Sequence, residues 1–231
     1  MKESAIVFVI PAFNEEKVVH QTIKPICQAG YRVVCVDDGS GDSTAQLSRE
    51  AGAYVIRHMI NSGQGASLQT GFQFILQSPG EFSQVDYVVT FDADGQHSLA
   101  DLETFVSALE EDSDLDIVLG SRFLSSNFMG SRLKSYILKT MAYISKYTLG
   151  IKLTDRHNGY RVIRKSRLAL FHIKSPGYEH ADEFIHLISK HNLKYREVAT
   201  NVQYTEYSLA KGQPVINGVK MLFDRLINGW K

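Results

Sequence analysis

Tyr87-Val88-Val89-Thr90-Phe91-Asp92-Ala93-Asp94-Gly95-Gln96-His97 is an apolar run that leads directly into acidic and amide side chains. The apolar part predicts a buried strand of a parallel sheet, because such strands are covered on both faces. Residues two apart on an extended segment point to the same side, so a strand that continued past Phe91 would present Asp92, Asp94 and Gln96 together. Taken alone, the stretch also fits a solvated turn rich in aspartate.

These three side chains would supply two carboxylates and one amide carbonyl oxygen. Hard divalent cations such as Mg²⁺ and Mn²⁺ prefer oxygen ligands of this kind. Two neighbouring carboxylates repel each other unless a cation or a shared proton lies between them. We therefore predict a metal site formed by Asp92, Asp94 and Gln96, with Mg²⁺ or Mn²⁺ as the cofactor.

The composition limits the class of protein. The chain has 231 residues, 25 of them basic and 25 acidic, which fits one α/β domain with a substantial core. The balanced charge argues against a protein that coats nucleic acid, so we expect no nucleic-acid partner. Cys27 and Cys35 are too few for a disulfide framework or a cysteine-based metal site, and they fit a reducing compartment.

Neither a signal peptide nor a membrane span is expected. The apolar run at residues 5–10 is too short for the core of a signal peptide, and Pro11 ends it. No window reaches the roughly 18 apolar residues that a membrane-spanning helix requires. We therefore expect a cytoplasmic protein, which at most rests on the inner face of the cell membrane.

Apolar runs and helical patterns alternate along the first half of the chain. Strands are expected at 5–10, 31–36, 54–57, 85–91 and 116–119, and helices at 15–29, 42–51, 66–77 and 98–109. This order predicts an α/β fold with a mostly parallel, Rossmann-like sheet and right-handed crossovers. Without a repeat or linker, residues 1–231 read as one domain. We expect its nucleotide-binding part at about 1–122 and its acceptor side at about 123–231.

Polar clusters follow three of the expected strands. They are Pro11-Ala12-Phe13-Asn14-Glu15, Asp37-Asp38 and Asp92-Ala93-Asp94. In open α/β sheets the carboxyl ends of parallel strands meet at one edge, where ligands bind, so the clusters predict one crevice. The small residues around Gly65 would let backbone N–H groups approach a diphosphate, although a simple tight turn explains them equally well.

Five blocks of the sequence resemble the signature blocks of family 2 glycosyltransferases. They are residues 9–16, residues 36–44, residues 91–97, Gly120-Ser121-Arg122, and the block of Asp155, Asn158, Gly159, Tyr160 and Arg161. The similarity covers about residues 5–205 and is closest to the branch that transfers hexoses to dolichol or polyprenyl phosphates. It implies a GT-A fold, a nucleotide-sugar donor such as a UDP- or GDP-hexose, a divalent metal and inversion at the anomeric carbon.

The resemblance also implies roles for single residues. Asp92, Asp94 and Gln96 would hold the metal on the diphosphate, while Arg122 and Arg161 would face phosphate oxygens of the donor or of a phosphorylated acceptor. A surface ion pair is the alternative for each arginine. The nucleotide would lie against Pro11, Phe13, Glu15, Asp37, Asp38, Gly65 and Ala93.

The need for a catalytic base depends on the acceptor. A sugar hydroxyl needs a carboxylate within hydrogen-bond reach, whereas a lipid phosphate is already ionised near neutral pH. Asp155, Asp182 and Glu183 are the candidates, and Glu183 best matches the acidic position of the family. Asp155 fits acceptor binding or charge stabilisation equally well.

Residues 132–149 and 215–230 each place apolar side chains on one helical stripe and basic side chains elsewhere. They predict amphipathic helices in the C-terminal part of the chain. Such helices lie in an anionic bilayer interface or pack on their own core, and the last one also fits a homodimer contact. The three readings remain open at the level of the sequence.

The sequence thus predicts a metal-dependent inverting hexosyltransferase that acts on a polyprenyl phosphate or a growing cell-surface glycan. The segment at 205–212 departs from the mannose synthase pattern and leaves both acceptors open. A sugar-nucleotide pyrophosphorylase would need a glycine-rich loop where residues 11–15 stand. A non-catalytic scaffold that binds nucleotide sugars or a membrane surface is the remaining alternative.

Overall fold

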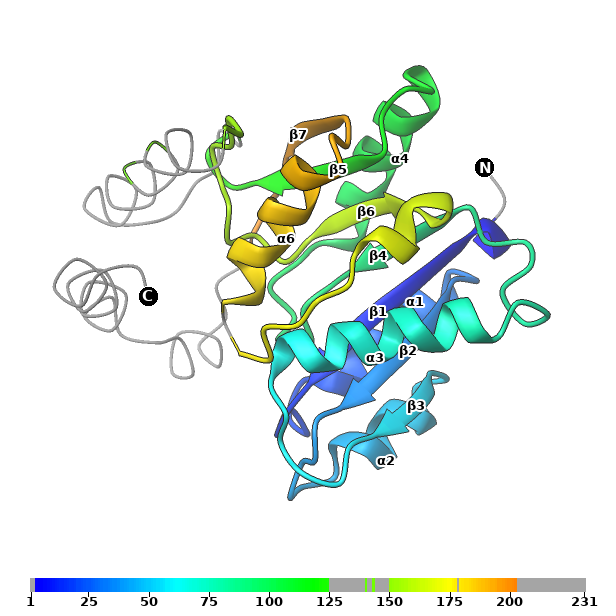
Figure 1. The fold of residues 1–231 in the computed structure, drawn as a ribbon. Coiled ribbons are helices and arrows are strands. Elements are labelled where there is room, and N and C mark those ends of the chain that lie inside the picture. Colours follow the sequence, from blue (N-terminus) through cyan, green and yellow to red (C-terminus); the bar gives the residue numbers. More distant parts are fainter. Residues whose placement is uncertain (1–2, 125–139, 141–142, 144–149, 178, 203–231) are drawn as a thin grey trace, which may run out of the picture.

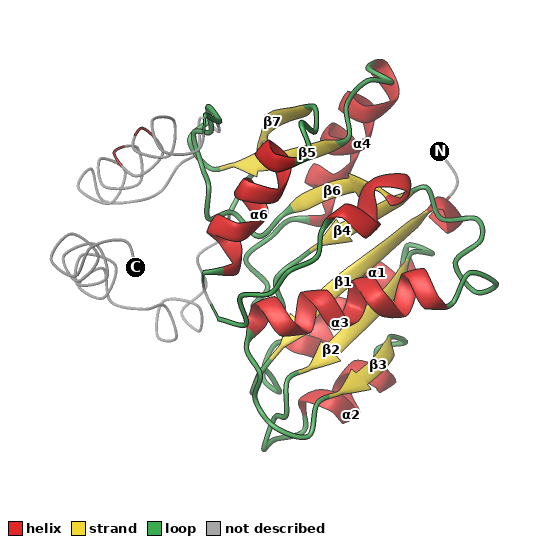
Figure 2. Ribbon diagram, viewed as in Figure 1, coloured by secondary structure: helices red, strands yellow, loops and turns green. Residues whose placement is uncertain are grey.

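The computed structural model describes residues 3–124, 140, 143, 150–177 and 179–202. In this part of the chain, a seven-stranded sheet lies between helices on both of its faces (Figures 1 and 2). The strands are β1 (Ile6–Ala12), β2 (Arg32–Asp37), β3 (Tyr54–Arg57), β4 (Tyr87–Thr90), β5 (Ile117–Ser121), β6 (Arg161–Arg164) and β7 (Tyr195–Ala199). The helices are α1 (Val19–Gln28), α2 (Thr44–Glu50), α3 (Gln64–Gln77), α4 (Leu102–Glu111) and α6 (His180–Lys190), with 3₁₀ turns η1 (Glu3–Ala5), η2 (Leu99–Asp101) and η3 (Lys165–Leu170).

The order of the strands is β3-β2-β1-β4-β6-β5-β7. Neighbouring strands are parallel except at β6, which runs antiparallel to both β4 and β5. Because of this reversal, the first residue of β6 lies at the same edge as the last residues of β1, β4 and β5. The sheet is therefore mostly parallel, as predicted, with one strand that enters the carboxyl edge from the opposite direction.

β1 shows how the sequence builds both faces of the sheet. Ile6, Phe8 and Ile10 pack in the hydrophobic cluster that contains residues of α1 and α4. Val7 and Val9 pack in the cluster that contains residues of α3 and α6. All five side chains are fully buried, which explains why the strand is a continuous apolar run without polar alternation.

The first half of the chain forms the predicted alternation of strands and helices, with shifted boundaries. The helix expected at 15–29 begins at Val19, and the strand expected at 85–91 ends at Thr90. β6 and β7 were not predicted, because β6 has an arginine at each end and β7 alternates exposed and partly buried residues at the sheet edge. Of the expected amphipathic helices, 215–230 and nearly all of 132–149 lie outside the described residues. In the described part of the chain, no helix is long and apolar enough to cross a membrane.

Gly71 lets α3 lie close to β1, and we expect alanine there to destabilise the fold. A Cβ at Gly71 would lie 2.4 Å from Cγ1 of the buried Val9. Overpacking typically costs about 1 to 3 kcal/mol and exceeds the gain in helix propensity, which is at most about 1 kcal/mol. Urea unfolding of Gly71→Ala should therefore show a lower free energy of unfolding. Gly80→Ala is the control, because its Cβ would meet nothing within 4 Å; equal effects of the two variants would contradict the prediction.

Candidate active site at the carboxyl edge

The chain turns sharply after β4. β4 ends at Thr90, and the following residues form a turn in which Gly95 has a φ of +74°. The predicted continuation of the strand past Phe91 is therefore wrong, and strand alternation does not explain how the acidic side chains lie. The backbone N–H of Gln96 donates to Oδ1 of Asp94 over 3.0 Å and holds the turn. Gln96 as a metal ligand stays a prediction.

Asp92 follows β4 and is held by two side chains. Its Oδ2 lies 2.8 Å from Nε2 of His97, and its Oδ1 accepts from Nε2 of Gln64 over 3.1 Å. Burial acts to raise the pKa of Asp92, but the hydrogen bond and charge of His97, with the charges of Arg161 and His180, lower it overall. Asp92 therefore keeps its negative charge beneath the surface.

Asp94 shows the opposite balance. Burial, followed by the charge of Asp92, raises the pKa of Asp94 to about 6. A hard divalent cation would relieve both the burial and the repulsion, so this carboxylate pair fits Mg²⁺ or Mn²⁺. Within the described ranges, no three His, Cys, Asp or Glu side chains come together to hold a metal. Further ligands would come from other groups, such as the predicted Gln96 amide, water or a bound substrate.

Gly159 brings the backbone of the late signature block against Asp92. A Cβ at Gly159 would lie 2.3 Å from Oδ2 of Asp92, so only glycine fits there. Oγ1 of Thr90 donates to the Gly159 carbonyl over 2.6 Å, and Nδ2 of Asn158 donates to Oγ1 of Thr200 over 3.0 Å. The first contact joins the end of β4 to the segment before β6, and the second joins that segment to Thr200, which follows β7.

Arg161 is the first residue of β6 and its side chain is buried. Its guanidinium lies over the Phe184 ring, 4.3 Å from the ring centroid. Burial lowers the pKa of Arg161 to about 10, although the charges of Asp92 and Asp155 act to raise it. In the described part of the chain, neither a hydrogen bond nor an ion pair reaches this guanidinium. A buried cation without a partner is costly, which favours an anionic ligand beside it.

Arg122 forms a bidentate ion pair with Asp155. Nε of Arg122 lies 2.6 Å from Oδ2, and its second terminal nitrogen lies 2.7 Å from Oδ1. Burial acts to raise the pKa of Asp155, but the contacts with Arg122 outweigh it and lower the pKa. The pair is largely buried, so it is not the surface ion pair that was the alternative. A carboxylate held ionised by arginine is a weak base, which argues against Asp155 as the catalytic base.

Asp37 and Asp38, at the end of β2, both hold neighbouring loops. Asp38 accepts from the backbone N–H groups of Ser62 and Gly63 over 2.9 and 2.7 Å, and its Oδ1 lies 2.7 Å from Nδ1 of His58. Asp37 lies 3.0 Å from Nε of Arg57 in an ion pair. Both carboxylates are buried and engaged within the protein, and their roles toward a nucleotide stay predictions.

The first two signature blocks are joined to each other by hydrogen bonds. The backbone N–H of Asn14 donates to Oγ of Ser40 over 2.9 Å, and Oδ1 of Asn14 accepts from the backbone N–H of Gly41 over 3.0 Å. The backbone N–H of Glu15 donates to Oγ1 of Thr44 over 2.8 Å. These hydrogen bonds fix the two loops to each other.

The remaining predicted nucleotide-binding residues lie around these loops. Pro11 is in β1, and Phe13 beside it is 40 % exposed. Glu15 is close enough to Asp94 for its charge to act on the pKa of that residue. Ala93 is buried, and its carbonyl accepts from a threonine of α1 over 3.0 Å. The structure brings these residues to the edge at which Asp92 and Asp94 lie.

Gly65 and Glu183 hold the loop that precedes α6. The backbone N–H of Gly65 donates to the carbonyl of Pro176 over 2.8 Å, and a Cβ at Gly65 would lie 2.0 Å from the carbonyl oxygen of Ser175. The Glu183 carboxylate accepts from the backbone N–H groups of Lys174 and Ser175 over 3.0 and 2.6 Å. Burial acts to raise the pKa of Glu183, but these hydrogen bonds lower it. Glu183 as a base stays a prediction that its loop contacts do not support.

Sequence reasoning missed several residues of the site. In the sequence, His97 stands only as the last residue of a signature block. In the structure, its ring holds Asp92 and packs against Tyr160, with the ring centroids 5.3 Å apart. Gln64 of α3 donates to the same carboxylate, and the charge of His180 in α6 acts to lower its pKa. His97 could have been suspected from its position after the acidic pair, but nothing local marked Gln64 or His180.

These features define an α/β protein that carries, at the carboxyl edge of its sheet, a buried arginine and a pair of carboxylates suited to a divalent cation. The family model described as Glycosyl transferase family 2 matches residues 7–170. The chain belongs to glycosyltransferase family 2.

Two relatives match nearly the whole chain. The uncharacterized protein MJ1222 of Methanocaldococcus jannaschii is 36 % identical, over 96 % of this chain and 91 % of its own. The UDP-N-acetylglucosamine–dolichyl-phosphate N-acetylglucosaminyltransferase of Methanococcus voltae is 29 % identical, over 98 % of this chain and 97 % of its own. The second name supports the polyprenyl-phosphate branch of the family.

The fold also matches a solved enzyme. Glucosyl-3-phosphoglycerate synthase of Mycobacterium tuberculosis, in a complex with Mg²⁺ and UDP, superposes with a TM-score of 0.66. The match covers 92 % of this chain and 73 % of that chain, at 18 % sequence identity. It confirms the GT-A-like arrangement of the sheet and helices.

Because the pKa of Asp94 is raised, we predict that replacing Asp94 stabilises the protein and that this stabilisation depends on pH. In chelator-treated protein at pH 7.5, Asp94→Asn removes a buried charge that Asp92 repels, so the variant should be more stable than wild type. The wild-type pKa of Asp94 is about 6, above the usual value of 3.8, so the difference should shrink as the pH falls through 6 and disappear only near 3.8 and below.

Thermal unfolding of both proteins between about pH 4 and 7.5 measures this effect. Glu110→Gln, at an exposed carboxylate of α4, is the control and should behave alike at both ends of the range. A variant at Asp94 that is no more stable than wild type at pH 7.5 would show that the two carboxylates do not repel.

Proposed function

We propose that this glycosyltransferase moves a hexose from a nucleoside-diphosphate sugar to a polyprenyl phosphate, with inversion and with the help of Mg²⁺ or Mn²⁺. The observation that carries the proposal is the buried Arg161 guanidinium, which has no anionic partner among the described residues and lies near the charge of Asp92. The name of the Methanococcus voltae relative supports the same acceptor class.

The carboxylates of the site support a phosphate acceptor over a sugar hydroxyl. A hydroxyl acceptor needs a carboxylate free to take its proton. Asp155 is ion-paired with Arg122, Glu183 holds the loop at 174–175, and the pKa values of both are lowered. Asp182 is paired with Arg156. A phosphate acceptor is already ionised and needs only to be positioned.

On the donor side, Asp92 and Asp94 would hold the metal, and the loops after β1, β2 and β3 would hold the nucleotide. The bound metal would offset the negative charge that develops on the leaving diphosphate. His97 and Gln64 keep Asp92 ionised and fix its orientation. An ionised Asp94 is repelled by the neighbouring Asp92 carboxylate. A cation that neutralises both charges would relieve this repulsion, so the pair would bind a cation strongly.

On the acceptor side, Arg161 and Arg122 would hold the phosphate against the anomeric carbon. A phosphate oxygen attacks that carbon from the face opposite the diphosphate, forms the new C–O bond, and expels the nucleoside diphosphate. The attack from the opposite face inverts the configuration. No proton leaves the acceptor in this step, so no base is required.

Arg161→Lys tests the acceptor site directly. Lysine keeps the charge but loses the planar fork and the fit over Phe184. With farnesyl phosphate as acceptor and UDP-N-acetylglucosamine, UDP-glucose and GDP-mannose as donors, we expect kcat/KM to fall about 10- to 100-fold. Arg196→Lys, at an exposed arginine of β7, should leave it unchanged. NMR of the product would report the anomeric configuration.

Two outcomes would count against the proposal. One is transfer to glycan hydroxyls with none to farnesyl phosphate, which would favour a glycan acceptor. The other is an absence of any donor binding in the presence of Mn²⁺, which would favour the non-catalytic scaffold.

The proposal includes peripheral contact with the inner face of the membrane. Met59 and Ile60 follow β3 and are 99 % and 73 % exposed, Leu124 follows β5 and is 49 % exposed, and Phe13 after β1 is 40 % exposed. The strands β1, β3 and β5 all end at the carboxyl edge. Exposed apolar side chains along one edge favour contact with a membrane, where a polyprenyl phosphate resides.

Met59→Ser with Ile60→Ser tests this contact. Burial in lipid is worth about 0.8 kcal/mol per CH₂ group, so losing two apolar side chains should weaken binding to phosphatidylglycerol vesicles by about tenfold or more. Leu76→Ser is the matched control, because Leu76 is 40 % exposed but lies at the far end of α3, away from this edge. Vesicle sedimentation gives the measurement, and equal binding of the double variant and wild type would remove this edge from the membrane contact.

A further inference from the structure

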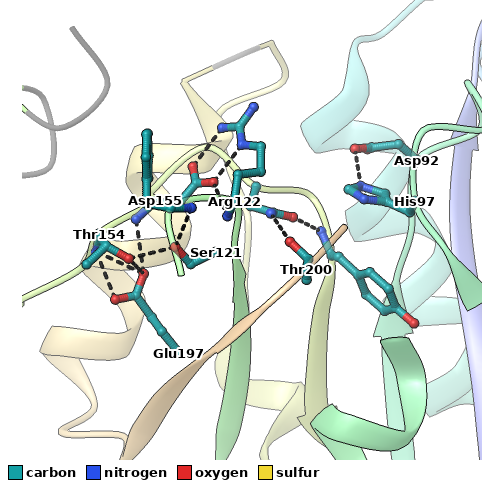
Figure 3. A network of polar contacts seen from close by, with 11 residues as sticks. Asp92, His97, Ser121, Arg122, Thr154, Asp155, Glu197 and Thr200 are labelled. Atoms are coloured by element: carbon teal, nitrogen blue, oxygen red, sulfur yellow. Dashed lines mark hydrogen bonds and ion pairs between the residues drawn. The ribbon is translucent and has the colours of Figure 1, made fainter. Parts of the chain in front are cut away.

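Glu197 of β7 binds the chain segment that carries Asp155. Its Oε1 accepts from the backbone N–H groups of Thr154 and Asp155 over 2.9 and 3.0 Å, and from Oγ1 of Thr154 over 3.0 Å. Its Oε2 lies 2.8 Å from the same Thr154 nitrogen. Figure 3 shows the carboxylate facing this turn from the strand below it. One partly buried side chain therefore accepts hydrogen bonds from three donors of the turn.

The same turn is tied to the segment that carries Arg122. Oγ1 of Thr154 lies 2.7 Å from Oγ of Ser121, which in turn accepts from the backbone N–H of Phe123 over 3.2 Å. The backbone N–H of Arg122 donates to Oδ2 of Asp155 over 3.1 Å, beside the bidentate contact of its guanidinium. Hydrogen bonds to the turn thus hold both the backbone and the side chain of Arg122 in place.

Glu197 stands beside Asp155 at an electrostatic cost. Burial raises the pKa of Glu197, the hydrogen bonds from the turn act to lower it, and the charge of Asp155 raises it further. The hydrogen bonds that the Glu197 carboxylate accepts offset the cost of its burial and of its repulsion by Asp155. The carboxylate does not contact Arg122, so it acts on that residue only through the turn.

We propose that Glu197 is a positioning residue of the acceptor-phosphate site: it fixes the turn at 154–155, the turn fixes the Asp155 carboxylate, and that carboxylate aims the Arg122 guanidinium. This inference rests on the proposed function, in which Arg122 and Arg161 hold the acceptor phosphate. Glu197 touches neither substrate.

β7 supplies its own control. Tyr195 lies two residues before Glu197, so the two side chains leave the strand on the same side. The Tyr195 hydroxyl accepts from the backbone N–H of Lys152 over 3.1 Å, in the same segment but away from Asp155. Tyr195→Phe therefore loses a contact between β7 and this segment without disturbing the arginine.

The test compares Glu197→Gln with Tyr195→Phe. The glutamine has the size of glutamate, and its carbonyl oxygen can replace Oε1, but its NH₂ group would then stand in the place of Oε2 and face the Thr154 N–H, a second donor, 2.8 Å away. We expect Glu197→Gln to raise the KM for farnesyl phosphate about tenfold while the KM for the donor changes less than about twofold. Tyr195→Phe should leave both values unchanged. A tenfold loss in both variants would mean that β7 only stabilises the segment and would overturn the inference.

A double-mutant cycle shows whether Glu197 acts through Arg122. In an Arg122→Lys background the fork is already lost, so adding Glu197→Gln should cost less than about twofold. A further tenfold loss, or a Glu197→Gln single variant that behaves as wild type, would overturn the positioning role.

Binding of farnesyl phosphate, measured by thermal shift, separates this inference from the proposed function. If wild type binds the ligand without transferring sugar, the proposed reaction fails, and a weaker shift in Glu197→Gln than in Tyr195→Phe still supports the positioning role. If wild type transfers sugar and Glu197→Gln matches it, only the inference fails. If wild type neither binds nor transfers, both fail.

Discussion

The carboxyl edge of this sheet is organised around a partly buried negative charge on Asp92. His97, Gln64 and the nearby arginine keep that charge in place, and Gly159 leaves just enough room for it. The charge then makes its neighbour Asp94 harder to ionise. A site that holds one carboxylate ionised beside another is unfavourable on its own and becomes favourable with a cation. The rest of the edge is the scaffold that maintains this arrangement.

The sequence predicted the parallel part of the fold because its strands are continuous apolar runs, such as β1, that need no partner to be recognised. It could not predict β6, whose four residues begin and end with arginine. The alternation argument for Gln96 failed because the chain leaves the strand at Thr90 and turns at Gly95. Strand termination depends on tertiary contacts that no local pattern records.

The motif blocks correctly indicated the carboxyl edge of the sheet as the place of the site. They did not indicate which contacts each residue makes there. Asp38 and Glu183 were expected to face ligands, and both accept backbone N–H groups of loops: Asp38 from a loop 25 residues later, and Glu183 from the loop that precedes its own helix. Glu197 belonged to no block and binds the turn that carries Asp155. A carboxylate that orders a loop and one that binds a ligand look identical in a sequence. Only the structure distinguishes the two kinds of carboxylate, because it shows which hydrogen-bond donors surround each one.

The contact between Gly159 and Asp92 joins two parts of the chain that have different tasks. Asp92 belongs to the half that would hold the donor, whereas Gly159 leads into the strand that carries Arg161. Recombination between relatives would therefore have to respect this pair. A hybrid that combined the donor half of one enzyme with the acceptor half of another would need an incoming segment that leaves room for the Asp92 carboxylate, as glycine does here.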